Sequence, residues 1–228
     1  MKPLRYSFFF RFVRFFARLF GKKYTSRVED FDGPAVFVCR HLNLHGPMTL
    51  MKWLKIPFRP MVLNVFFRYA DCRRQYKDFT FSKRAGMPRP VATVLATIAA
   101  SAVAPLVRGV RAIPVYRGKT KKVFETFQKS LAALENGDKI AVFPDVEYTA
   151  DSGHKSDIYT GFLSLDKYYY AKEKKHIPFI VLTVDDEKRE IRASEPIFFP
   201  DDVPFAEAAV TVKENLMHHL YPEEWENA

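Results

Sequence analysis

The sequence predicts an α/β fold: a single layered domain with a mixed, largely parallel sheet flanked by helices, plus an N-terminal amphipathic helix. Short apolar runs of strand length alternate along the chain with longer stretches at helical spacing. The 228 residues are 48% hydrophobic and 15% aromatic, which is enough for a core and excludes an intrinsically disordered chain. The two cysteines, Cys39 and Cys72, are too few for a disulfide scaffold and favour a reduced, cytosol-facing compartment.

Charge divides the chain into two regions, and this division predicts a separate N-terminal segment. Residues 1–28 contain eight lysines and arginines and no acidic residue, so they hold +8 of the net charge of +10. Residues 29–228 are left with only +2. We therefore expect a basic membrane-surface segment at 1–28 and an α/β domain at 29–228.

The N-terminal segment has the pattern of a helix that lies on a membrane surface. On a helical projection, Arg11, Arg14 and Arg18 fall in one narrow stripe, and phenylalanines cover much of the rest. Aromatic bulk opposite a cationic stripe suits an anionic bilayer. The arginines interrupt the apolar core that a signal peptide or a spanning helix needs. An internal packing helix stays open as an alternative, whereas the many phenylalanines disfavour a nucleic-acid-binding arm.

The remaining elements follow from apolar runs and helical spacing. Buried strands are expected at 35–39, 109–117, 139–143 and 177–184. Helices are expected at 48–54, 90–107, 121–135 and 160–172. The stretch 90–107 has no charge and approaches the length of a membrane span. Its Pro105 and many small residues favour a helix that is buried or half-embedded.

Polar clusters follow three of the predicted strands, where α/β sheets usually carry their sites. The clusters are Arg40 to Pro47, Arg117 to Lys119, and Phe143 to Tyr148. A histidine with a pKa near 6.5 can remove a hydroxyl proton at neutral pH, and arginine suits a phosphate. Four further histidines lack metal-ligand spacing and are expected at the solvated surface, so no metal is predicted: His154, His176, His218 and His219.

These three clusters, together with the last predicted strand, contain residues that match, in order, the four motifs of a known family. The first motif, Asn-His-x4-Asp-Pro, reads Arg40-His41-Leu-Asn-Leu-His-Gly46-Pro47. The second, Gly-x-Ile-Pro-Val-x-Arg, reads Arg111 to Arg117, and the third, Phe-Pro-Glu-Gly-Thr-Arg, reads Phe143 to Tyr148. The fourth, a proline inside an apolar strand, is Ile177 to Val181. On these residues the chain resembles the glycerophospholipid acyltransferase superfamily, the lysophosphatidic-acid-acyltransferase-like proteins.

The resemblance implies a membrane-associated enzyme of phospholipid biosynthesis. It would move a fatty acyl group from acyl-CoA or acyl-carrier protein to a glycerolipid hydroxyl, in particular that of a lysophospholipid, at the cytoplasmic face of a membrane. The thioester is a co-substrate, and neither a cofactor nor a nucleic acid is implied. His41 would be the general base and Arg117 would hold the acceptor's phosphate. Asp145 would shape the acceptor pocket beside His41, and the further substrate-binding residues would be Arg40, Glu147 and His45.

Two departures from the family pattern leave alternatives open. The first-motif aspartate, which orients the histidine, is Gly46 here, and the third motif lacks its arginine. Either Asp145 or Glu147 supplies the missing orientation, or the chain has shifted to another chemistry, or it is an inactive or weakened relative that binds lipid or a partner. His45, in the tripeptide Leu44-His45-Gly46, is a rival base.

Overall fold

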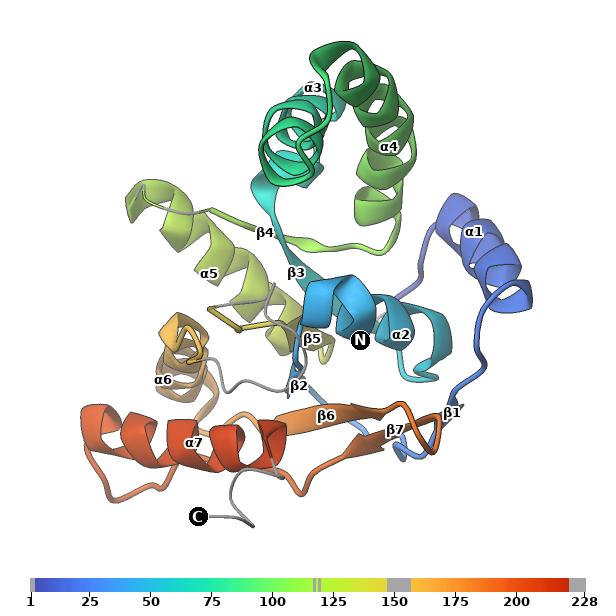
Figure 1. Cartoon of the computed structure of the whole chain (residues 1–228). Coiled ribbons are helices and arrows are strands. Elements are labelled where there is room, and N and C mark those ends of the chain that lie inside the picture. The colour runs from blue at the N-terminus through green and yellow to red at the C-terminus, as the bar shows by residue number, and fades with distance from the viewer. Residues whose placement is uncertain (1–2, 117, 119, 147–156, 222–228) are drawn as a thin grey trace. The chain divides into compact units, whose positions relative to one another are not determined.

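The structure is a computed structural model that describes residues 3–116, 118, 120–146 and 157–221. It is an α/β fold with mixed, mostly parallel strands flanked by helices, which confirms the predicted class (Figure 1). The chain forms two compact units, the first of residues 1–4, 16–58 and 129–228, the second of 5–15 and 59–128. This division does not follow the charge boundary at residue 28, because charge reports composition rather than backbone packing.

The first unit is built on five strands among its described residues. They are β1 (Thr25–Ser26), β2 (Ala35–Val38), β5 (Lys139–Val142), β6 (Phe179–Asp185) and β7 (Glu190–Ala193). Their order is β1-β7-β6-β2-β5. β2 pairs in parallel with both β5 and β6, whereas β6 and β7 are antiparallel. All four residues of β2 are buried, as expected for a central strand covered on both faces.

Helices cover this sheet and complete the core. They are η1 (Leu42–Leu44), α2 (His45–Trp53), η4 (Gly161–Leu163), α6 (Ser164–Glu173) and α7 (Phe205–Leu220). Phe37 on β2 packs edge-on against Phe58, with ring centroids 6.4 Å apart. Leu50 from α2 and Leu54, which follows that helix, join the same buried cluster. Burying each such side chain stabilises the fold by about 1.5–3 kcal/mol.

One histidine corrects the sequence interpretation. His176 is not at the solvated surface, because its side chain is only 16% exposed and its Nδ1 lies 2.7 Å from Asp166 Oδ2. Burial raises the pKa of the Asp166 carboxyl, while hydrogen bonds from the Ile177 N–H and from His176 act in the opposite direction. The His176 ring is held inside the protein because it contacts the buried carboxylate of Asp166, ten residues earlier.

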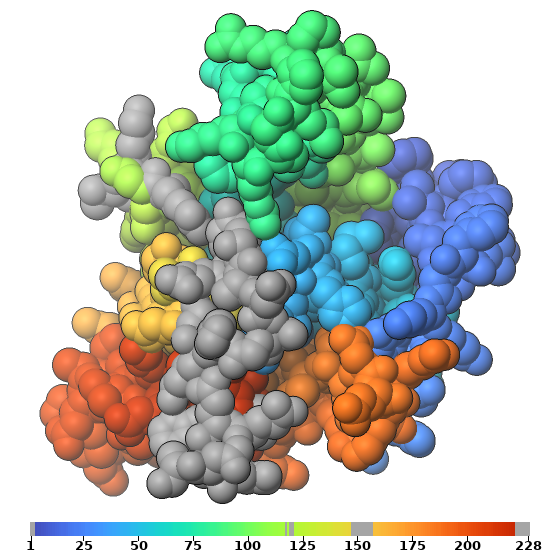
Figure 2. Space-filling model, viewed as in Figure 1, coloured from blue at the N-terminus to red at the C-terminus, as the bar shows by residue number. Residues whose placement is uncertain are grey.

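The second unit carries a helical hairpin. Its elements are β3 (Phe58–Leu63), η2 (Asn64–Phe66), α3 (Tyr69–Arg74), η3 (Gln75–Arg84), α4 (Arg89–Gly109) and β4 (Ile113–Val115), with β3 and β4 parallel. The strand predicted at 109–117 is shorter, because Gly109 still belongs to α4 and Arg111 turns the chain with a φ of 60°. Helix α4 packs along α3 and η3 (Figures 1 and 2).

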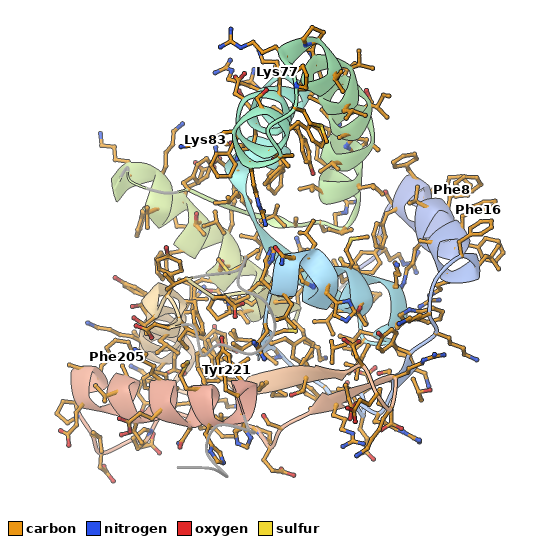
Figure 3. The ribbon with its side chains drawn as sticks, viewed as in Figure 1. Phe8, Phe16, Lys77, Lys83, Phe205 and Tyr221 are labelled. Carbon is orange, nitrogen blue, oxygen red and sulfur yellow. The ribbon has the colours of Figure 1, made fainter. Side chains whose placement is uncertain are left out.

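Helix α1 (Phe8–Leu19) confirms the helix predicted near the N-terminus, and α5 (Thr120–Glu135) confirms that at 121–135. Ser7 begins α1, because its Oγ accepts a hydrogen bond from the N–H of Phe10. The basic stripe is partly turned inward: Arg18 Nε donates to the Lys52 carbonyl, and its guanidinium covers Trp53. The exposed side is aromatic, as Phe8 and Phe16 illustrate by projecting away from the helix (Figure 3).

Candidate functional site

The carboxyl ends of two neighbouring parallel strands, β2 and β5, lie together at one edge of the first unit's sheet. Val38 at the end of β2 is in register with Val142 on β5 and with Val181 on β6. His41 follows β2 and Asp145 follows β5, so the structure brings these two sequence-predicted residues together. β6 runs on to Asp185, and the next residue, Asp186, reaches the same region.

Asp145 is the buried centre of the first cluster. One of its oxygens, Oδ2, accepts the backbone N–H of His41 at 2.6 Å, and the carboxylate is only 7% exposed. Its other oxygen, Oδ1, accepts the Tyr221 hydroxyl at 3.2 Å. Arg40 places its guanidinium 4.3 Å from the centre of the Tyr221 ring. Tyr221, labelled in Figure 3 at the end of α7, therefore links Arg40 to Asp145, which in turn holds the backbone of His41.

The His41 imidazole is bonded to its own loop. Its Nδ1 accepts a hydrogen bond from the Leu44 N–H at 3.3 Å, and the ring packs edge-on against Phe143. A neutral imidazole whose Nδ1 accepts carries its proton on Nε2. Burial lowers the pKa of His41 below its usual 6.5, and the charge of Asp145 acts in the opposite direction. His41 is therefore a neutral ring at pH 7 in this arrangement.

The loop between the two histidines of the first motif is strained. Three consecutive residues other than glycine have left-handed backbone angles: Leu42 (φ 42°), Asn43 (φ 51°) and Leu44 (φ 80°). Each such residue costs roughly 1–2 kcal/mol relative to a right-handed conformation. Strain of this kind persists only where surrounding contacts impose it, and it clusters at functional sites.

Gly46 has no room for a side chain. A Cβ at this position would lie 1.9 Å from the Arg40 carbonyl oxygen and 3.3 Å from Cys39 Sγ. The obstacle at 1.9 Å is a backbone atom, which cannot rotate away as a side chain could. The path of the backbone, and not only the residue type, therefore excludes a first-motif aspartate at this position.

A second histidine cluster lies beside the first. His45 opens α2, and its Nε2 is 2.8 Å from Asp186 Oδ1, which also accepts the Tyr24 hydroxyl. Burial, together with the hydrogen bond and charge of Asp186, raises the pKa of Tyr24 to about 12, so this hydroxyl stays a donor at neutral pH. When His45 donates from Nε2, its Nδ1 keeps a lone pair. A carboxylate holding a histidine ring in this way is the arrangement that general bases use.

Sequence reasoning missed Tyr24, Asp186 and Tyr221, because none of them belongs to one of the four motifs. Two predicted substrate-binding residues, Arg117 and Glu147, lie outside the described residues. Within the part of the chain that the structure describes, no group of three or more His, Cys, Asp or Glu side chains could hold a metal ion.

Comparisons with models of protein families, with curated proteins and with solved structures found no match to this chain.

Proposed function

We propose that this chain is a membrane-associated acyltransferase that moves a fatty acyl group from a thioester, acyl-CoA or acyl-carrier protein, to a glycerolipid hydroxyl. The main support is the position of His41 and Asp145, which match two of the four ordered motifs and meet at the carboxyl ends of β2 and β5. The preferred acceptor is a lysophospholipid, whose phosphate Arg40 and Arg117 would bind.

The reaction needs one base and one electrophile. A histidine takes the proton of the acceptor hydroxyl, the oxygen attacks the thioester carbonyl carbon, and the carbon–sulfur bond breaks. The thiolate then leaves and takes the proton from the imidazolium. His41 is the base that the motif order implies. To accept a proton at Nε2, His41 must first carry its proton on Nδ1, which requires the contact with the Leu44 N–H to open.

His45 is the rival base within the same proposal. Its ring already has a carboxylate partner, Asp186, which would stabilise the imidazolium that forms during transfer. Its side chain is 39% exposed, so a substrate can reach it without a change in the loop. These contacts favour His45 as the base if the His41 loop stays closed.

A catalytically weakened lipid-binding or partner-binding protein is the second candidate. The crowding at Gly46 favours this candidate, because it prevents the usual orienting aspartate. The hydrogen bond from the Leu44 N–H to His41 Nδ1 also favours it, because it holds the ring in the tautomer whose Nε2 cannot accept a proton. Such a protein would keep the fold and the affinity for lipid without transferring acyl groups.

Helix α1 would hold the protein on the membrane surface, at the cytoplasmic face, in either candidate. The large apolar side chains on its exposed side are Phe8, Phe9, Phe12, Phe15, Phe16 and Leu19. An aromatic face of this size suits burial at the boundary between headgroups and acyl chains.

The experiment measures acyl transfer from labelled acyl-CoA and acyl-carrier protein to glycerol-3-phosphate, lysophospholipids and diacylglycerol on liposomes. Wild type is compared with His41→Gln and His45→Gln, with circular dichroism as the folding control. We expect transfer that one of the two substitutions abolishes. Intact liposome binding without acyl transfer to any acceptor would contradict the proposed enzymatic activity and would leave the lipid-binding protein as the remaining candidate.

A further inference from the structure

Helix α4 has two opposite faces of different character. Alanines at every fourth position form the face that packs against the hairpin partner, and all are buried: Ala92, Ala96, Ala100 and Ala104. The side chains on the opposite face are larger, apolar and exposed: Val91 (49%), Val94 (60%), Leu95 (37%) and Ile98 (63%). The spacing of these four residues, i, i+3, i+4 and i+7, places them in one stripe.

The length of this stripe argues for shallow contact with a bilayer. Helix α4 is long and apolar enough to cross a membrane, yet its large exposed apolar side chains, from 91 to 98, extend only about 10 Å along the axis. A hydrocarbon core is about 30 Å thick. The partner helices also carry charges that hydrocarbon would not accept, such as the Lys77–Asp78 ion pair and Arg73 against Thr97.

The charge around the stripe indicates which surface it meets. From Phe79 to Arg111 the sequence contains five basic residues and no acidic one. Three of them, Lys83, Arg84 and Arg89, belong to the tip where η3 ends and α4 begins, next to the stripe in sequence; Lys83 is labelled in Figure 3. An apolar stripe whose neighbouring sequence, from Phe79 to Arg111, carries cations and no anion is complementary to an anionic lipid surface.

We propose that the tip of this hairpin, residues 79–98, docks on an anionic bilayer, with Val91, Val94, Leu95 and Ile98 inserted among the lipids. Lys83, Arg84 and Arg89 then lie at the headgroups. This contact is separate from that of α1 and does not require acyl transfer, so it can hold for either candidate function.

A local fluorescent probe tests the contact while α1 remains in place. The Ile98→Trp variant is mixed with vesicles of phosphatidylcholine and phosphatidylglycerol, and its emission is compared with that of Val210→Trp. Val210 is a matched control because it is 56% exposed on α7 in the first unit. The unsubstituted chain, which has two tryptophans of its own, supplies the background.

We expect the Ile98→Trp variant to show a blue shift and quenching by brominated acyl chains that exceed those of the Val210→Trp control. The effect should be weaker on vesicles of phosphatidylcholine alone, because these offer the cations no anionic headgroups.

Two outcomes would overturn the proposal. One is an unchanged emission of the Ile98→Trp variant on vesicles that bind the full chain. The other is a blue shift that depends on protein concentration without vesicles, which would indicate a second copy of the chain as the occupant. As a second measurement, the double substitution Val94→Ser with Ile98→Ser should raise the Kd for the anionic vesicles about tenfold, whereas Val210→Ser should not. Acyl transfer is not measured, so its absence would not affect this result.

Discussion

The carbonyl oxygen of Arg40 occupies the space in which a side chain on residue 46 would begin, 1.9 Å from the ideal Cβ position. Arg40 and Gly46 therefore determine each other: the loop can follow this path only when residue 46 has no side chain. This relationship gives a physical reason why position 46 carries a glycine and not an aspartate.

Gly46→Asp should consequently destabilise the protein and should not raise acyl transfer. Overpacking of this kind costs typically about 1–3 kcal/mol, which urea unfolding monitored by circular dichroism would detect. Gly161→Ala is the matched control, because a Cβ there meets nothing within 4 Å. A stable and more active Gly46→Asp protein would show that the loop can rearrange around an aspartate.

The substitution Tyr221→Phe should destabilise the Asp145 cluster while the aromatic ring still fills its place. The substitution removes the hydroxyl that donates to Asp145 Oδ1 but keeps the ring under the Arg40 guanidinium. Losing a hydrogen bond to a charged group costs about 1.5–3 kcal/mol of unfolding free energy. Tyr69→Phe, at a tyrosine that is 44% exposed, should change that free energy by much less in the same urea titration. Equal losses in both variants would contradict the role given to Tyr221.

The stability of the protein should depend on pH through His41. Its pKa is lowered by burial when the chain is folded, and it returns to about 6.5 when the chain unfolds. Between these two values the unfolded chain binds a proton that the folded chain does not, so acid favours unfolding. As pH falls from 7 through 6.5, wild type should lose stability relative to His41→Gln, until the pH passes below the lowered folded pKa. If the curves of unfolding free energy against pH for wild type and His41→Gln run parallel, this expectation is contradicted.

Asp186→Asn separates the two candidate bases. If His45 is the base, loss of the carboxylate should lower kcat by about tenfold or more, because the imidazolium loses its partner. Glu187→Gln, at the exposed neighbour, is the control and should leave kcat unchanged. If His41 is the base, Asp186→Asn should leave kcat unchanged, while His41→Gln abolishes transfer.

Much of the fold could be predicted, because its central elements carry strong local signals. β2, β5 and β6 are largely apolar runs, and α4 has no charged residue between Arg89 and Arg108. β3 was missed because Arg59 and Pro60 break its apolar run. The long α7 and the polar η3 were also missed, the latter because it has no regular apolar spacing.

The site could be predicted only where a residue lies within a motif a few positions after a buried strand. His41 and Asp145 have this position, and the parallel register of β2 and β5 brings them together. Tyr221 reaches Asp145 from the end of α7, and Tyr24 reaches Asp186 across most of the chain. Those contacts depend on how helices and strands pack, which local patterns do not encode.

The left-handed run from Leu42 to Leu44 also has a thermal consequence. Its three backbone conformations are held only by surrounding contacts, so this loop should loosen on heating before the buried strands separate. Loosening would remove the Leu44 N–H from His41 Nδ1 and allow the ring proton to change nitrogens while β2 and β5 stay paired. The temperature at which the chemistry of His41 changes should therefore lie below the temperature at which the sheet melts.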